Sequence, residues 1–292
     1  MNILKVFLTI VVSVPAIDSY NVNNEHVFKD AVNMVHIKPV VSSTPAVTNR
    51  KFEGPRKYWF NPKIHTFGNT GLFGGFHAAM APFATLLIDE LAYEGENVRN
   101  KIARHIRRLV NKRDAKIVDM CCGVGMSTRA LSKAFHDAGS LVAIDTSPEM
   151  IAMANFLNSD NPVAKVMKKE DSPSTSKCDI SYHLANAEKT ELPSGSFDLV
   201  TIMYAFHEAP YLGRYQILRE ARRLLSPGAT LAVIDISTGY KPSPSMLAGE
   251  PYVLEYQKNI KDQLKNVQGF TDYKYTEVVE GHVGFWLLTR KG

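Results

Sequence analysis

The chain has little cysteine and no long uncharged apolar run. Its three cysteines include two adjacent residues, Cys121 and Cys122, and a normal bridge between neighbours would be badly strained. No CxxC pair exists, and Cys178 with His183 falls well short of a zinc set, so no metal site is expected. No apolar run approaches the ~20 residues that a membrane-spanning helix needs. These absences exclude a disulfide scaffold and a polytopic membrane protein.

An excess of charge of one sign is also lacking. Lys and Arg number 34 against 29 Asp and Glu in 292 residues, and 45% of the residues are hydrophobic. This composition excludes disordered and collagen-like chains, and the length suits one large domain or two small ones. A formal net charge of +5 does not compel a nucleic-acid or membrane partner.

A signal-like targeting segment is expected over residues 1–19. An apolar run follows Lys5 and ends at Pro15, where small residues would permit cleavage. The same run could instead be a buried first strand. No Asn-x-Ser/Thr sequon supports a glycosylated secreted product, so entry into the secretory route with onward delivery, for example to a plastid, is a hypothesis. Residues 20–56 are polar and irregular, which is typical of a linker.

Residues 57–115 are predicted to form an N-terminal helical cap or lid. The aromatic patch Tyr58-Trp59-Phe60 opens this region, and helices are expected over 76–93 and 97–110. The second helix carries a basic stripe mostly opposite its apolar face. A solvated helix back is favoured over an RNA-binding or lipid-binding surface. The stripe consists of Arg99, Lys101, Arg104, Arg107 and Arg108.

From Lys116 onward the pattern alternates between short β-branched runs and helical segments. Strands are predicted over 117–120, 141–144, 179–182, 199–202, 231–234, 273–279 and 283–289. Helices are predicted over 127–135, 148–157, 211–225 and 254–267. This alternation is typical of a parallel sheet with helices on both faces. The connector 280–282 is too short for a crossover, so the last two strands should pair antiparallel.

Glycine and acidic residues stand where the first two strands end. The first strand continues into a loop with Gly123 and Gly125 and then directly into a helix, whose first N–H groups are unpaired. Asp145 follows the second strand, 20 residues after Gly125, where an acid can accept hydrogen bonds from both ribose hydroxyls of an adenosine. Taken alone, such a loop could be a mere turn, and Asp145 could cap the next helix.

Residues 116–237 resemble a class I S-adenosylmethionine (SAM)-dependent methyltransferase of the UbiE-like type. Five landmarks occur in family order: the glycine loop, the acid after strand two, Asn186-Ala187 after strand three, the Phe-Asp entry to strand four, and the Pro-Gly turn before strand five. The resemblance implies an α/β, Rossmann-like, doubly wound sheet of seven strands in the order 3-2-1-4-5-7-6, with the last strand antiparallel. A methyltransferase domain over 116–292 is therefore expected.

The resemblance also implies which residues hold SAM. Asp119 would orient the amino end of the methionine part, and Gly123 with Gly125 would pass beneath its carboxylate. Asp145 would hold the ribose hydroxyls.

The adenine end of the implied site departs from the family pattern. Asn186 replaces the usual Asp, but its side-chain oxygen can still accept a hydrogen bond from the adenine amino group, beside the N–H of Ala187. Cys121 stands where the family usually has its first glycine. Thr146 and Tyr204 complete the expected cofactor-binding set.

The predicted reaction is methyl transfer to a small-molecule acceptor by in-line displacement. The cofactor supplies the reactive group, so the protein chiefly aligns the acceptor and excludes water. His207 is the candidate base and Glu208 its orienting partner, although His207 could line the pocket without proton transfer. The walls of the acceptor pocket are expected at Tyr58-Trp59-Phe60, the Asn69 loop, residues 240–256 and His282.

Two other functions remain open from the sequence. A nicotinamide-dependent oxidoreductase would want G-x-G-x-x-G, which neither register of the loop provides. A non-catalytic protein with the same fold could bind a partner or RNA through the basic stripe. The intact glycine loop and Asp145 argue against lost cofactor binding.

Overall fold

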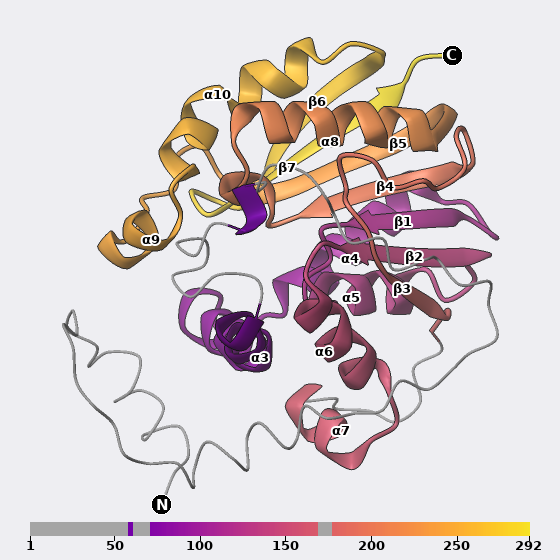
Figure 1. The fold of residues 1–292 in the computed structure, drawn as a ribbon. Helices are drawn as coiled ribbons and strands as arrows, with labels where there is room; N and C mark the ends of the chain where they lie inside the picture. Colours follow the sequence, from indigo (N-terminus) through magenta and orange to yellow (C-terminus); the bar gives the residue numbers. More distant parts are fainter. Residues whose placement is uncertain (1–57, 61–70, 169–176) are drawn as a thin grey trace, which may run out of the picture. The chain divides into compact units, whose positions relative to one another are not determined.

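The computed structural model describes residues 58–60, 71–168 and 177–292 (Figure 1). All of them lie in one compact unit, Gly54–Gly292. The expected targeting segment, the linker and the Asn69 loop lie outside the described residues. Among the described helices, none is both long enough and apolar enough to cross a membrane.

Seven strands form one sheet in the order β3-β2-β1-β4-β5-β7-β6. The strands are β1 (Lys116–Met120), β2 (Ser140–Asp145), β3 (Ile180–Leu184), β4 (Phe197–Met203), β5 (Leu225–Ile236), β6 (Phe270–Val279) and β7 (Val283–Arg290). Strands β1 to β5 pair parallel, whereas β7 pairs antiparallel with both β5 and β6. The predicted fold class, strand order and antiparallel last strand are confirmed.

Helices cover both faces of this sheet, and its central parallel strands β1 and β4 are buried along nearly their whole length. One core cluster joins the sheet to α8 (Tyr211–Leu224) and α10 (Val253–Asn266), around Phe206, Tyr256 and Trp286. A second cluster on the opposite face joins it to α4 (Val98–Val110) and α5 (Met126–Ala134). The remaining elements are the short helices η1 (Tyr58–Phe60) and η2 (Phe206–Glu208), and α3 (Gly71–Ala92), α6 (Pro148–Asn158), α7 (Pro162–Lys168) and α9 (Pro244–Gly249).

The helices differ from the sequence expectation in two respects. Helix α3 begins at Gly71, five residues earlier than expected. Helices α7 and α9, of seven and six residues, were not predicted, because they are too short for an apolar stripe to repeat. Helix α9 nevertheless carries a start signal, since the Ser243 side chain accepts from the Met246 N–H at 3.2 Å and Pro244 follows the cap.

Candidate active site

A cleft opens at the carboxyl ends of β1, β2 and β4, where the strand order reverses on the two sides of β1. Its walls come from η1, α3, α4, the loop after β1 and the segment around η2. The structure brings most of the sequence-predicted site residues to this cleft. Those lining it are Cys121, Gly123, Asp145, Thr146, Asn186, Ala187, Tyr204 and Glu208. Asp119, Gly125 and His207 do not line the cleft themselves.

Asp145 ties the glycine loop to β2. Its Oδ2 accepts a hydrogen bond from the Gly123 N–H at 2.9 Å, and its Oδ1 accepts from the Ser147 N–H at 2.9 Å. The N-cap of α6 is Ser147 itself, whose hydroxyl accepts from Met150 N–H, so the capping alternative for Asp145 is wrong. Asp145 therefore fixes the loop while it lines the cleft.

Three positions of the loop have left-handed backbone conformations. Gly125 has φ +74°, and a Cβ there would lie 2.4 Å from the Tyr182 hydroxyl, so only glycine fits. Gly123 has φ +52° with open space on its Cβ side, which lets a ligand approach the backbone closely. Cys121 has φ +60°, which explains why a glycine suits this position and why its cysteine is under strain. Burial, with smaller effects from Asp145 and Glu208, raises the pKa of the Cys121 thiol, so it stays neutral.

Asp119 is buried beneath the loop. Its carboxylate accepts hydrogen bonds from the hydroxyls of Thr128 and Thr201, each at 2.6 Å, and so joins β1 to α5 and β4. Burial raises its pKa to about 6, although the two hydroxyls favour the charged form. A contact between Asp119 and the amino end of a methionine stays a prediction.

Asn186 occupies a tight turn after β3. Its side-chain oxygen accepts from the Glu188 N–H at 2.9 Å, which fixes the side chain at the cleft edge beside Ala187. An amide oxygen has a second lone pair, so this bond does not prevent the adenine contact predicted for it.

The N-terminal cap region contributes an arginine that the sequence analysis did not assign to the site. Arg99, in the first turn of α4, lines the cleft, and its guanidinium carbon lies 4.8 Å from the centre of the Tyr204 ring. Tyr204 follows β4 with φ +57°. The solvated helix back that was favoured for the stripe fits the exposed Lys101, Arg104 and Arg108, whereas Arg99 lines the cleft and Arg107 pairs with Asp137 at 3.0 Å.

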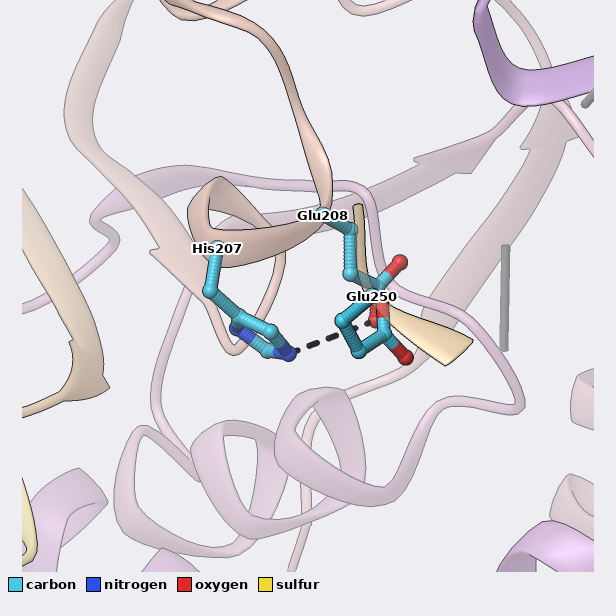
Figure 2. Close-up of side chains that lie close together, drawn as sticks. All are labelled: His207, Glu208 and Glu250. Atoms are coloured by element: carbon cyan, nitrogen blue, oxygen red, sulfur yellow. Dashed lines mark ion pairs between the residues drawn. The ribbon is translucent and has the colours of Figure 1, made fainter. Parts of the chain in front are cut away.

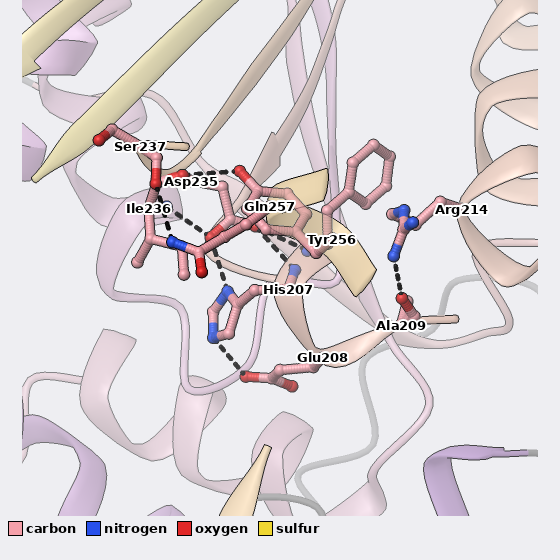
Figure 3. Close-up of polar contacts among 10 residues, drawn as sticks. His207, Glu208, Ala209, Arg214, Asp235, Ile236, Ser237, Tyr256 and Gln257 are labelled. Carbon is pink, nitrogen blue, oxygen red and sulfur yellow. Dashed lines mark hydrogen bonds and ion pairs between the residues drawn. The ribbon is translucent and has the colours of Figure 1, made fainter. Parts of the chain in front are cut away.

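His207 is held by an aspartate that the sequence analysis also missed. Figure 3 shows Asp235 at the end of β5, with its Oδ1 2.6 Å from His207 Nδ1. Asp235 Oδ2 also accepts from the N–H groups of Phe206 and His207, at 2.8 and 3.1 Å. Asp235 thus orients His207 at Nδ1, the role expected for Glu208. The signal in the sequence was an acidic residue directly after the strand predicted over 231–234.

The carboxylates around His207 determine its charge. Its exposed fraction is only 8%, and this burial opposes the imidazolium form. Asp235, Glu208 and Glu250 outweigh that effect and raise the pKa of His207 to about 9. At neutral pH His207 is therefore an imidazolium and must lose a proton before it can act as a base. Its catalytic role and that of Glu208 stay predictions.

His207, Glu208 and Glu250 form a compact cluster (Figure 2). His207 Nε2 lies 3.7 Å from Glu208 Oε1, and one ligand-type atom of each residue lies within 4.8 Å of the others. These three side chains could hold a divalent cation, which the sequence analysis did not anticipate. The imidazolium already supplies a positive charge beside the two glutamates, so the geometry alone does not call for a metal.

The expected acceptor walls are only partly at the cleft. Tyr58 and Trp59 line it, with ring centres 5.1 Å apart and planes at 83°. Tyr240 and His282 contact each other away from the lining, at 5.6 Å. Tyr256 is buried, and its hydroxyl donates to the Ile236 carbonyl at 2.7 Å, so it belongs to the core.

Comparisons with known proteins agree with this geometry. Residues 118–233 match the family model described as a methyltransferase domain. A demethylmenaquinone methyltransferase of Lactococcus lactis is 31% identical over 136 residues, which cover 46% of this chain and 47% of that protein. A 2-phytyl-1,4-naphtoquinone methyltransferase of Synechococcus elongatus is 24% identical over 168 residues, covering 58% of this chain and 65% of that one.

One solved structure shows the same fold. The CurJ carbon methyltransferase superimposes with a TM-score of 0.55 and 16% identity, covering 74% of this chain and 60% of that chain. The chain spans between about half and two thirds of the length of the curated relatives described above.

Proposed function

We propose that the protein transfers a methyl group from SAM to a small-molecule acceptor. The basis is that residues 118–233 match a methyltransferase domain of the SAM-dependent class and are distantly homologous to UbiE-type enzymes. One observation carries this proposal: the glycine loop after β1 is fastened to Asp145 at the mouth of a cleft. This hydrogen bond places the loop backbone and the Asp145 carboxylate side by side in the cleft. An adenosyl ligand with an amino-acid tail requires both, the carboxylate for its ribose and the backbone for its tail.

The residues of the cleft suit this cofactor. Gly123 leaves open the space where a Cβ would stand, so the amino-acid part of a ligand can rest on the loop backbone. Asp145 would accept from the ribose hydroxyls, and Asn186 with Ala187 would hold the adenine edge. When bound, SAM supplies an electrophilic methyl group on a sulfonium. The chain's own contribution is to orient the acceptor, exclude water and accept any proton released.

For the acceptor, we propose a flat ring of the quinone class named in the relatives' descriptions, in its reduced form, which carries ring hydroxyls. Tyr58 and Trp59 offer edge and face contacts to such a ring at one wall of the cleft. Glu208 lines the same cleft and can accept a hydrogen bond from a ring hydroxyl.

Calorimetric titration with S-adenosylhomocysteine and with NAD, followed by transfer of labelled methyl groups, tests the proposal. We expect S-adenosylhomocysteine to bind and NAD not to bind. The labelled methyl should then pass from SAM to a reduced naphthoquinone lacking the methyl group, or to another small molecule in an extract. Binding without transfer would favour the non-catalytic alternative, and NAD binding alone would favour the oxidoreductase.

For the N-terminal region, we propose that residues 1–19 direct the chain into the secretory route. The basis is the sequence pattern alone, an apolar run between Lys5 and Pro15. Sequencing the N-terminus of the mature protein tests it. A mature chain that retains Met1 would contradict the proposal.

A further inference from the structure

Arg99 is a partly buried cation that makes no hydrogen bond to any of the residues that the structure describes. Its side chain is 16% exposed and lines the cleft. Within the part of the chain that the structure describes, its polar neighbours include the Tyr204 ring, at 4.8 Å, the Asp89 carboxylate, at 3.8 Å, and the Tyr93 hydroxyl, whose pKa the Arg99 charge lowers against the larger opposing effect of burial. The distance to Asp89 exceeds that of a hydrogen bond, so none of its five N–H donors is satisfied there.

Two other arginines of the same fold, unlike Arg99, make hydrogen bonds to carboxylates. Arg107 holds Asp137 through two hydrogen bonds of 3.0 and 3.2 Å, and Arg223 holds Glu220 through bonds of 2.6 and 2.8 Å. Solvent in the cleft reaches the Arg99 donors, and their fork of N–H groups best matches a carboxylate or phosphate. Arg99 is therefore oriented by Asp89 and Tyr204 yet keeps its donors for a ligand.

The position of Arg99 along the cleft indicates which ligand group it meets. Asp145 is the last residue of β2 and Tyr204 follows β4, and these two strands flank β1 on opposite sides. A ligand with its ribose on Asp145 that crosses the loop after β1 brings its other end towards Tyr204 and Arg99. In SAM that other end is an amino acid with a carboxylate.

We propose that Arg99 binds the carboxylate of the amino-acid end of SAM. The inference rests on the proposed function, since it takes SAM as the ligand. With this contact, the first turn of α4 becomes part of the cofactor site. That turn belongs to the region expected to be a cap. The contact also accounts for the buried Asp89, whose charge holds the guanidinium towards the cleft without saturating it.

Calorimetry with two ligands tests this contact. S-adenosylhomocysteine carries both the ammonium and the carboxylate, whereas its decarboxylated form keeps only the ammonium. Arg99→Gln should weaken binding of S-adenosylhomocysteine about 10- to 100-fold, the loss expected for a charge-assisted hydrogen bond. The same change should leave the decarboxylated ligand unaffected or bound more tightly, because an unpaired cation beside its ammonium is removed. Arg104→Gln, an exposed neighbour on α4, is the matched control and should change neither affinity.

The outcomes separate this inference from the proposed function. If the wild-type protein fails to bind S-adenosylhomocysteine, the proposed function fails. If it binds and Arg99→Gln binds equally well, or weakens both ligands by the same factor, the carboxylate contact is overturned. Arg99→Lys keeps the charge but not the fork, so it should still fold and should lose part of the preference for the carboxylate. An undiminished preference in Arg99→Lys would also count against the proposal.

Discussion

Two residues that line the cleft, Cys121 and Tyr204, have strained backbone conformations, and contacts with the surrounding structure keep them there. Cys121 and Tyr204 both have positive φ angles, which cost a non-glycine residue about 1–3 kcal/mol. Cys121 packs against the core cluster that joins the sheet to α8 and α10, and the Tyr204 N–H donates to the Ile234 carbonyl at 2.8 Å. Both residues follow a strand end at the point where the chain must turn away from the sheet. The strain therefore lies where a ligand would be bound.

Gly125 is the residue whose replacement should damage the loop most. Gly125→Ala adds a Cβ at φ +74° and 2.4 Å from the Tyr182 hydroxyl, so we expect a loss of about 2–3 kcal/mol in the free energy of unfolding. Gly123→Ala is the matched control, because its φ is also positive but its Cβ meets no atom, and it should cost about 1 kcal/mol. Urea unfolding measures both. Equal losses in the two variants would mean that Tyr182 does not restrict the loop.

The raised pKa of His207 should make the free energy of unfolding depend on pH. Its folded value of about 9 lies above the ordinary value of 6.5, so the stabilisation is fully present below about pH 6.5 and is lost as the pH rises through 9. Asp235→Asn removes the nearest carboxylate and should move the titration of His207 to lower pH. NMR titration of the ring, assigned with His207→Gln, reports this value. A His207 that titrates near 6.5 in the wild-type protein would contradict the carboxylate arrangement.

Between elements, one buried arginine joins α8 to η2 and α10. Arg214 is fully buried, and it donates to the Ala209 carbonyl and, at 2.8 Å, to the Gln263 side chain (Figure 3 shows the first contact). Gln263 in turn donates to the Tyr211 carbonyl at 2.9 Å. This buried side chain, which does not itself line the cleft, thus fixes the segment that carries His207 and Glu208.

Removing this connection should destabilise the fold. Arg214→Met keeps much of the side-chain volume but leaves the acceptors on Ala209 and Gln263 unpaired, so we expect a loss of about 2–4 kcal/mol in the free energy of unfolding. Arg219→Met, exposed on the same helix, should change it by less than about 0.5 kcal/mol. Denaturant unfolding of the two variants makes the comparison. A loss no larger in Arg214→Met than in the control would show that α8 is held by its apolar face alone.

At the scale of the whole molecule, sequence reasoning succeeded where the determining interactions are local or repeat along the chain. The alternation of β-branched runs and helices predicted the sheet, and the loop around Gly123 with Asp145 predicted the cleft. Asp235 was missed because its contact with His207 depends on the pairing of β4 with β5, where Met203 lies beside Ile234. Arg99 was missed because its helical position looks solvated until α4 is placed beside the loop after β1. Tertiary contacts of this kind have no periodic signal in the sequence.

Because the cleft is built from elements spread along the chain, ligand binding should stabilise the described unit as a whole. Its walls come from η1, α3, α4, the loop after β1 and η2, all within Gly54–Gly292. S-adenosylhomocysteine at 100 times its dissociation constant should add about 2.7 kcal/mol to the free energy of unfolding, provided that it binds only the folded state. For a unit of this size the melting temperature should then rise by about 5–10 °C. Scanning calorimetry should show one transition that moves with ligand concentration, while NAD leaves it in place. Two transitions, of which only one moves, would mean that the cap helices and the sheet unfold independently, and no movement at saturation would mean that the cleft does not bind this ligand.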